Sequence, residues 1–206
     1  MIAPPPAVIL AGGRARRMGG GDKLLLEMGG APILDHILAR LRPQAGPIAI
    51  SANGDPARFA RFGLPVLPDP LPDFPGPLAG ILAAMIWAEG LGADAVVSVA
   101  GDTPFLPEGL VAGLNDSAAD SGIALAADHD AGGALRLHPT FGLWPVALRG
   151  ALKAALADGV RRIRQFAVPQ GFGTALFEAA PEASFFNINT PEDLAAARAR
   201  APALRK

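Results

Sequence analysis

A glycine-rich, cationic segment lies directly behind the first apolar run of the chain, residues 7–11 (AVILA). Glycine at the end of a strand lets main-chain N–H groups approach a ligand closely. Several fixed positive charges beside such amides suit a ligand with clustered negative charge, such as a triphosphate. The residues that carry this pattern are Gly12, Gly13, Arg14, Arg16, Arg17 and Lys23.

Two known phosphate-binding patterns do not fit this segment. The Walker A loop requires Gly-Lys-Ser/Thr, but Lys23 stands between Asp22 and Leu24. The dinucleotide fingerprint G-x-G-x-x-G is broken at Gly12-Gly13-Arg14. An exposed basic turn is the alternative interpretation, and the combination of glycines, cations and a preceding strand favours phosphate binding over it.

Single carboxylates follow two further apolar runs. Asp102 ends the β-branched stretch 94–102, and one carboxylate opposite a phosphate loop suits Mg²⁺, which takes its remaining ligands from water and substrate phosphates. The alternative is that Asp102 caps a helix starting near Pro107. Asp69 ends the stretch 64–69, where it either contacts a ligand or is only a turn residue.

Apolar strands alternate with amphipathic helices along the chain, which predicts a mostly parallel sheet with helices on both faces. In such sheets ligands bind at the carboxyl ends of the strands. Apolar spacing places Leu78, Ile81, Leu82, Met85 and Ile86 on one helical stripe. The expected strands are 7–11, 47–53, 64–69, 94–102, 122–128, 134–144 and 184–189, and the expected helices are 32–42, 77–89, 146–157 and 190–200.

Composition excludes several other classes of protein. The formal net charge is −1, so no global positive field favours nucleic acid. The chain of 206 residues contains no cysteine, which excludes disulfides and fits a reducing compartment. No apolar segment is long enough for a membrane span, and the N-terminus lacks the features of a signal peptide. We therefore expect a cytoplasmic protein with neither nucleic acid nor membrane as a partner.

The segment from Leu10 to Lys23, L-A-G-G-x-A-R-R-M-G-x-x-D-K, resembles the signature loop of the molybdenum cofactor guanylyltransferases. The stretch D-T-P-F at 102–105 and the stretch F-P-G-P-L-A-G-I at 74–81 match the same family. The resemblance implies an α/β fold of three Rossmann-like layers, of the nucleotide-diphospho-sugar transferase type. It also implies a single domain over 1–206, with a nucleotide-binding half of about 1–105 and an acceptor-binding half of about 106–200.

The resemblance implies a site for GTP and Mg²⁺, with Asp102 as the metal ligand. Lys23, Asp102 and Arg17 are then the catalytic residues, and Asp69 contacts guanosine through the base or the ribose. The family usually has asparagine at the position of Ser51. The implied GTP-binding residues are Leu10, Ala11, Gly12, Gly13, Arg14, Lys23, Ser51, Asn53, Asp69, Gly76, Pro77, Leu78 and Asp102.

The acceptor side of the family's cleft matches N-I-N-T-P at 187–191 and H-P-T at 138–140, so Asn187, Asn189 and His138 are the implied acceptor-binding residues. For the asparagines, a helix start at Thr190 is the alternative role. Residues 128–130 (DHD) are interpreted as a polar hairpin tip rather than a metal cluster. The basic run at 161–164 is either a solvated helix face or an acceptor phosphate site.

The implied reaction transfers GMP from GTP to molybdenum-loaded molybdopterin and releases pyrophosphate. Contact with cofactor-insertion proteins or molybdoenzymes is a further expectation. The alternatives are a cytidylyltransferase, a sugar-phosphate nucleotidyltransferase, or a non-catalytic GTP-binding module.

Overall fold

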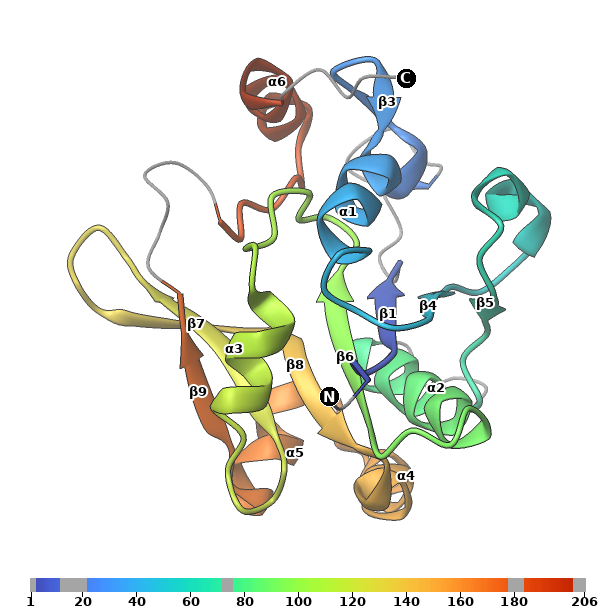
Figure 1. Cartoon of the computed structure of the whole chain (residues 1–206), viewed down its shortest axis with the longest axis vertical. Helices are drawn as coiled ribbons and strands as arrows, with labels where there is room; N and C mark the ends of the chain where they lie inside the picture. Colours follow the sequence, from blue (N-terminus) through green and yellow to red (C-terminus); the bar gives the residue numbers. More distant parts are fainter. Residues whose placement is uncertain (1–2, 12–21, 72–75, 178–183, 202–206) are drawn as a thin grey trace.

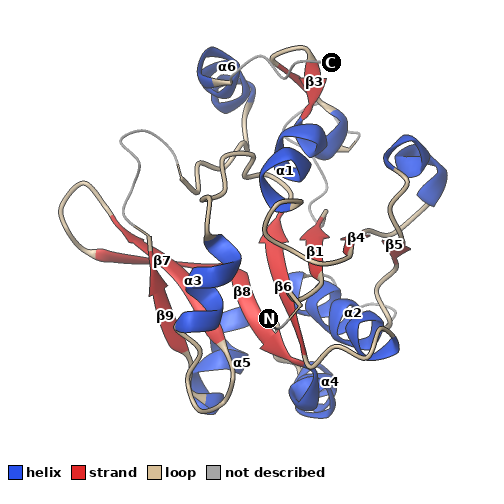
Figure 2. Ribbon diagram, in the orientation of Figure 1, coloured by secondary structure: helices blue, strands red, loops and turns tan. Residues whose placement is uncertain are grey.

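The computed structural model describes residues 3–11, 22–71, 76–177 and 184–201. Its central sheet has the strand order β5-β4-β1-β6-β8-β7-β9 (Figure 2). Within that sheet only β8 runs against its neighbours, because β6 and β7 both pair with it antiparallel while the other pairings are parallel. The strands are β1 (Ala7–Leu10), β4 (Ile48–Ser51), β5 (Val66–Leu67), β6 (Ala95–Ala100), β7 (Ala124–His129), β8 (Leu135–Pro145) and β9 (Gly173–Leu176).

Helices cover both faces of this sheet, which confirms the three-layer α/β fold (Figure 1). The two faces follow from the alternation along β1, where Ala7 and Ile9 join one core cluster while Val8 and Leu10 join the other. The first cluster includes α1 (Ile33–Leu41), α3 (Leu110–Asp116) and α6 (Pro191–Arg200). The second includes α2 (Pro77–Gly90), α4 (Arg149–Ala157) and α5 (Ile163–Gln170).

Smaller elements connect these layers. A two-stranded sheet pairs β2 (Glu27–Met28) with β3 (Ala31–Pro32). Three 3₁₀ segments occur in the described chain: η2 (Lys23–Leu25), η3 (Pro56–Phe62) and η4 (Val146–Leu148). No helix among the described residues combines the length and apolar character that crossing a membrane requires.

Most of the expected elements are present within one to three residues of their predicted bounds. The predicted stripe on α2 is buried at Leu78, Ile81, Leu82 and Met85, but Ile86 is 41% exposed, so its assignment to the core was wrong. Alanines and Gly80 fill much of the remaining buried surface of α2, so its covered face is wider than the stripe and turned away from Ile86.

The strand predicted at 184–189 was wrong. Ser184 and Phe185 form a turn, the following residues belong to no strand, and Phe185 has a positive φ of 70°. The apolar residues that suggested a strand are instead buried from a loop, since Phe185 and Ile188 are 4% and 0% exposed. Strand β9 and helix α5, which the sequence did not predict, complete the sheet edge and its cover.

Candidate active site

The site lies where β1, β4 and β6 end side by side. Leu10 is the register partner of both Ser51 on β4 and Ala100 on β6. The main chain continues this alignment one step further, because Ala11 donates to the Ser51 carbonyl and Gly101 donates to the Leu10 carbonyl. Three loops therefore leave the sheet at one edge, as expected for parallel strands.

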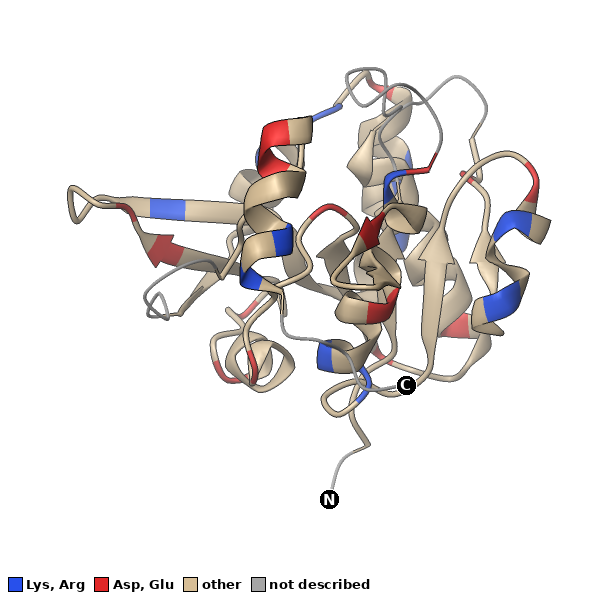
Figure 3. Ribbon diagram, turned by 90° about the horizontal axis from the view of Figure 1, so that it is seen from above, with Lys and Arg blue, Asp and Glu red and all other residues tan. Residues whose placement is uncertain are grey.

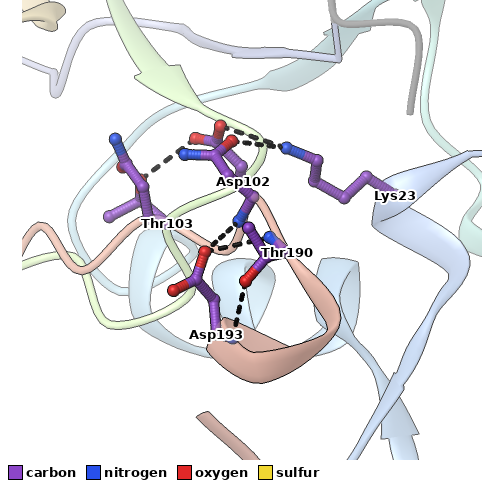
Figure 4. A network of polar contacts seen from close by, with 7 residues as sticks. Lys23, Asp102, Thr103, Thr190 and Asp193 are labelled. Atoms are coloured by element: carbon purple, nitrogen blue, oxygen red, sulfur yellow. Dashed lines mark hydrogen bonds and ion pairs between the residues drawn. The ribbon is translucent and has the colours of Figure 1, made fainter. Parts of the chain in front are cut away.

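Lys23, Asp102 and Asn189 converge at this edge from distant parts of the sequence (Figure 4). Lys23 Nζ lies 2.8 Å from Asn189 Oδ1 and 3.5 Å from Asp102 Oδ2. The Lys23 side chain is 17% exposed and that of Asp102 is 29% exposed, so both remain reachable from solvent. One cation and one anion, held together and open to a ligand, can bind a phosphate chain and a metal ion.

Asp102 is not a helix cap. The N-cap of α3 is Gly109, in the left-handed conformation, and α3 begins at Leu110 rather than near Pro107. The backbone carbonyl of Asp102 instead accepts from Ile188 N at 2.8 Å, which joins the end of β6 to the 184–190 loop. The Asp102 carboxylate is thus directed to the site and not to a helix end.

Thr103 is a site residue that the sequence reasoning did not single out. Its hydroxyl is 2.5 Å from Asn187 Oδ1 and 3.2 Å from Asp102 Oδ1, and the residue is fully buried (Figure 4). It links the predicted metal ligand to a predicted acceptor-binding amide. Its position directly after Asp102 in D-T-P-F was the available signal.

Asp193 fixes the loop that carries the two asparagines. The predicted N-cap Thr190 is confirmed: its hydroxyl accepts from Asp193 N, while Asp193 Oδ2 accepts from the backbone N–H groups of Asn189 and Thr190. The Asn189 backbone hydrogen bond is the main cause that holds the pKa of Asp193 below its ordinary value. A charged cap therefore orients Asn189 toward Lys23.

Asn53 and Asp69, two of the predicted GTP-binding residues, pair with each other. Asn53 Nδ2 donates to Asp69 Oδ2 at 2.7 Å, and Asp69 N donates to Asn53 Oδ1 at 2.9 Å. Asn53 is exposed and Asp69 is half-buried, so this reciprocal pair still presents further carboxylate and amide atoms to solvent. Two predicted GTP-binding residues thus form one unit.

Ser51 differs from this pair because it is 5% exposed and lies beneath α2. A Cβ built on Gly80 would be 2.6 Å from Ser51 Oγ, so glycine at position 80 allows the helix to pack closely on the end of β4. The same helix begins at Pro77 after Gly76, so its first turn leads directly to this contact at Gly80. Leu78 is buried, as is Leu10.

His138 belongs to a second cluster, on the β7–β8 hairpin. His138 Nε2 lies 2.8 Å from Asp128 Oδ1, and Arg136 donates to both oxygens of the same carboxylate. The His138 ring stacks on Phe185 with centroids 4.0 Å apart. Phe185 lies two residues before Asn187, so the 184–190 loop joins His138 to the Lys23 and Asp102 cluster.

The interpretation of residues 128–130 as one polar tip was wrong for Asp128, whose side chain is 1% exposed. His129 and Asp130 are exposed, as expected for a hairpin tip, and Asp130 accepts from Gly132 N and Ala134 N. Burial alone would raise the pKa of Asp128, but hydrogen bonds from Arg136 and His138 outweigh it and leave that pKa lowered. Burial lowers the pKa of His138, and Asp128 offsets only part of that effect.

Several predicted residues lie outside the described residues: Gly12, Gly13, Arg14, Arg16, Arg17, Phe74 and Pro75. In the basic run, Arg161 Nη1 donates to the carbonyls of Leu156 and Val160, and Arg162 is the N-cap of α5. Two of the three arginines of that run thus have structural roles at the start of α5.

The donor set at Asp102 fits Mg²⁺. Among the described residues no group of three or more acidic or histidine side chains gathers to form a complete metal cage. A lone carboxylate at a strand end, reachable from solvent and beside a lysine that attracts phosphate, suits an ion that takes its other ligands from water and substrate phosphates.

Comparison with known proteins identifies the family of the chain. The family model of the MobA-like NTP transferase domain matches residues 7–171. A molybdenum cofactor guanylyltransferase from Mesorhizobium japonicum is 50% identical over 182 residues, which cover 86% of each chain. One from Cereibacter sphaeroides is 50% identical over 176 residues, covering 85% of this chain and 86% of its own.

The fold also matches solved structures. The molybdopterin-guanine dinucleotide biosynthesis protein A from Archaeoglobus fulgidus superposes with a TM-score of 0.72 and 22% identity, over 95% of this chain and 97% of its own. The likeness at this identity concerns the fold, whereas the matches near 50% identity concern the family. The chain therefore belongs to the family of molybdenum cofactor guanylyltransferases, which carry the MobA-like NTP transferase domain.

Proposed function

We propose that this chain transfers GMP from GTP to the phosphate of molybdenum-loaded molybdopterin, giving the guanine dinucleotide cofactor and pyrophosphate. The observation that carries the proposal is the convergence of Lys23, Asp102 and Asn189 at the carboxyl ends of the strands. The relatives near 50% identity bear the name of this activity.

The chemistry needs positioning and charge compensation more than a strong base. The second pKa of a phosphate monoester lies near ~6, so the acceptor is mostly ionised at neutral pH. Its oxygen forms a bond to the α-phosphorus of GTP while the bond from that phosphorus to the bridging oxygen breaks. Pyrophosphate leaves with the electron pair of the broken bond.

The main obstacle is the approach of two anions, and the proposed site addresses it with cations. Lys23 binds the phosphate chain and offsets charge on the leaving pyrophosphate. Arg17 and Arg14, with the amides of residues 11–13, supply further positive charge to the same chain. Asn187 and Asn189 hold the acceptor. Asn189 lies beside the phosphate-binding lysine, because Lys23 Nζ contacts both Asn189 and Asp102.

Asp102 would hold the Mg²⁺ ion. When bound, the ion supplies positive charge to the GTP phosphates and lowers their repulsion of the acceptor. Lys23 lies beside the Asp102 carboxylate and compensates part of its negative charge.

Asn53 and Asp69 recognise guanosine. The Asp69 carboxylate has more acceptor positions than its bond from Asn53 uses, and guanine offers two neighbouring donors, N1–H and N2–H₂. We further propose that the reaction takes place in the cytoplasm, since a cysteine-free chain fits a reducing compartment. Its product would pass to cofactor-insertion proteins or molybdoenzymes.

Pyrophosphate release tests the proposal. Purified protein is given Mg²⁺, loaded acceptor and one of GTP, CTP or UTP. Release with GTP alone, lost in Asp102→Asn, supports guanylyl transfer. Release with CTP or UTP in preference to GTP would indicate a different nucleotidyltransferase, and GTP binding without release would indicate a non-catalytic module.

A further inference from the structure

Arg58 belongs to η3, a segment that carries two of the described arginines, and its guanidinium has three polar partners within the protein. The Lys and Arg positions of the described chain are coloured in Figure 3. Its Nη1 donates to the Asp55 carbonyl at 2.5 Å, and its Nη2 donates to the Asn53 carbonyl at 2.6 Å. Its Nε forms an ion pair with Asp22. The guanidinium also lies over the buried Phe59 ring, 4.7 Å from the centroid.

The backbone around Arg58 is shaped to receive the guanidinium. Gly54 has a φ of +87°, and a Cβ built there would lie 3.2 Å from Arg58 Nη1. The loop from Asn53 to Asp55 therefore curves closely around the fork of N–H donors. The Arg58 side chain is only 25% exposed as a result.

Asp22 connects this arginine to the phosphate side of the site. It occupies the N-cap position of η2 and immediately precedes Lys23. Among the described residues its carboxylate makes no capping hydrogen bond to that turn and instead forms an ion pair with Arg58. A shift of Asp22 would move the backbone that carries Lys23.

Asn53 connects the same arginine to the nucleoside side. Arg58 holds the Asn53 carbonyl, while the Asn53 side chain exchanges two hydrogen bonds with Asp69. One guanidinium is thus bonded to the loop before Lys23 and to the loop that carries the proposed guanosine ligands.

We propose that Arg58 is a positioning residue that couples the nucleoside side of the site, Asn53 and Asp69, to the phosphate side, Asp22 and Lys23. The proposal rests on the proposed GTP-binding function. Arginine suits this role because its planar, rigid fork binds a carboxylate and carbonyls in fixed directions, which an ammonium group does not reproduce.

This coupling matters most for a ligand that contacts both the nucleoside side and the phosphate side of the site. When two loops are held in register, a ligand that binds one side meets the other already in place and loses less freedom on binding. Breaking the link weakens GTP more than guanosine or pyrophosphate alone, since each of these contacts one side. We expect a loss of about fivefold or more in GTP affinity, the lower range of coupling between sites.

The experiment is calorimetric titration with GTP, guanosine and pyrophosphate in the presence of Mg²⁺. The variants are Arg58→Gln, Arg58→Lys, Asp22→Asn and the double variant Asp22→Asn/Arg58→Gln. Arg61→Gln is the matched control, because Arg61 lies on the same 3₁₀ segment, over the Phe62 ring at 5.0 Å, and pairs with Asp35 in place of Asp22. Its side chain is 63% exposed.

The proposal predicts that Arg58→Gln and Asp22→Asn each weaken GTP by about fivefold or more, and that the double variant is no weaker than either single one. Arg58→Lys does not restore affinity, Arg61→Gln binds normally, and KM for GTP rises more than kcat falls. A residue that merely stabilised the fold would lower the unfolding temperature without this dependence on Asp22.

Normal GTP binding by Arg58→Gln or by Asp22→Asn would overturn the proposal, as would independent, multiplying losses in the double variant. Asp22→Asn keeps both carbonyl bonds and the Phe59 contact of Arg58, so it remains a test even where an Arg58 variant does not fold. Failure of the wild-type protein to bind GTP would refute the proposed function instead.

Discussion

Replacing Thr103 by valine removes one hydroxyl from the centre of the site and changes the side-chain shape little. The residue is fully buried, and the hydroxyl lies 2.5 Å from Asn187 Oδ1 and 3.2 Å from Asp102 Oδ1. The backbone bond from Ile188 to Asp102 stays, so the 184–190 loop keeps one of its attachments to β6.

The size of the effect follows from the hydrogen-bonding capacity of one hydroxyl. A hydroxyl carries one proton and donates to one acceptor at a time, here Asn187 at the shorter distance. Because Asn187 is exposed, its amide regains water when the bond is lost. The loss is therefore that of one ordinary hydrogen bond, about 1 kcal/mol.

Two measurements report this loss. The unfolding temperature of a chain of this size should fall by roughly 2–4 °C. In steady-state kinetics at saturating GTP, KM for the acceptor should rise by about fivefold, the equivalent of about 1 kcal/mol. Thr103→Ser, which restores the hydroxyl, is the control. Valine with wild-type values in both assays, or serine as defective as valine, would refute the reasoning.

Three further predictions concern charged groups of the site. Lys23→Met removes the ammonium shared by Asp102 and Asn189 and should raise the GTP dissociation constant by roughly 10- to 150-fold, the value of one charge-assisted hydrogen bond; calorimetry showing no change would exclude Lys23 from phosphate binding. Asp193→Asn should lower the unfolding temperature at pH 7. Because the folded pKa of Asp193 lies below 3.8, the difference in unfolding temperature between variant and wild type should close as pH falls below that value. A difference that stays constant with pH would count against the charged cap. The His138 ring should titrate below pH 6.5 in an NMR experiment. Because the folded state binds the His138 proton less readily than the unfolded state, the stability of the fold should decline as pH falls below 6.5. A His138 pKa above 6.5 would show that the effect of Asp128 outweighs that of burial.

Local sequence patterns predicted the parts of the fold that local interactions determine. Thr190, Pro191 and Asp193 specify a helix start through capping bonds between near neighbours, and α6 begins where they indicate. The apolar run at 95–100 forms β6 and is buried on both faces of the sheet from Val96 to Ala100. Because parallel strands end at a common edge, the apolar runs alone were enough to assign the loops after Leu10, Ser51 and Ala100 to one site.

Tertiary contacts decided the rest. The apolar residues at 184–189 suggested a strand. Phe185 instead lies in a turn and stacks on His138, and Ile188 N donates to the Asp102 carbonyl. Asp128 looked like part of a polar turn, yet its charge is buried because Arg136 reaches it from the partner strand. His138, Asp102 and Arg136 are not sequence neighbours of the residues that they contact, so neither outcome could be derived from local pattern.

The carbonyl and carboxylate contacts of Arg58 were similarly hidden. A basic residue on a short surface segment normally indicates a solvated face. Its role became visible only when the structure placed Asp22, which is distant in sequence, against its Nε and curved Gly54 around its Nη1.

The central claim is that Lys23 and Asp102 together receive the phosphate chain of GTP at the carboxyl ends of the strands. A crystal structure with GTP and Mg²⁺ tests it most directly. We predict phosphate oxygens within hydrogen-bond distance of Lys23 Nζ and a magnesium ion bound between Asp102 and the phosphates. Phosphates bound elsewhere on the chain, with Lys23 still paired to Asp102 and Asn189, would contradict the claim.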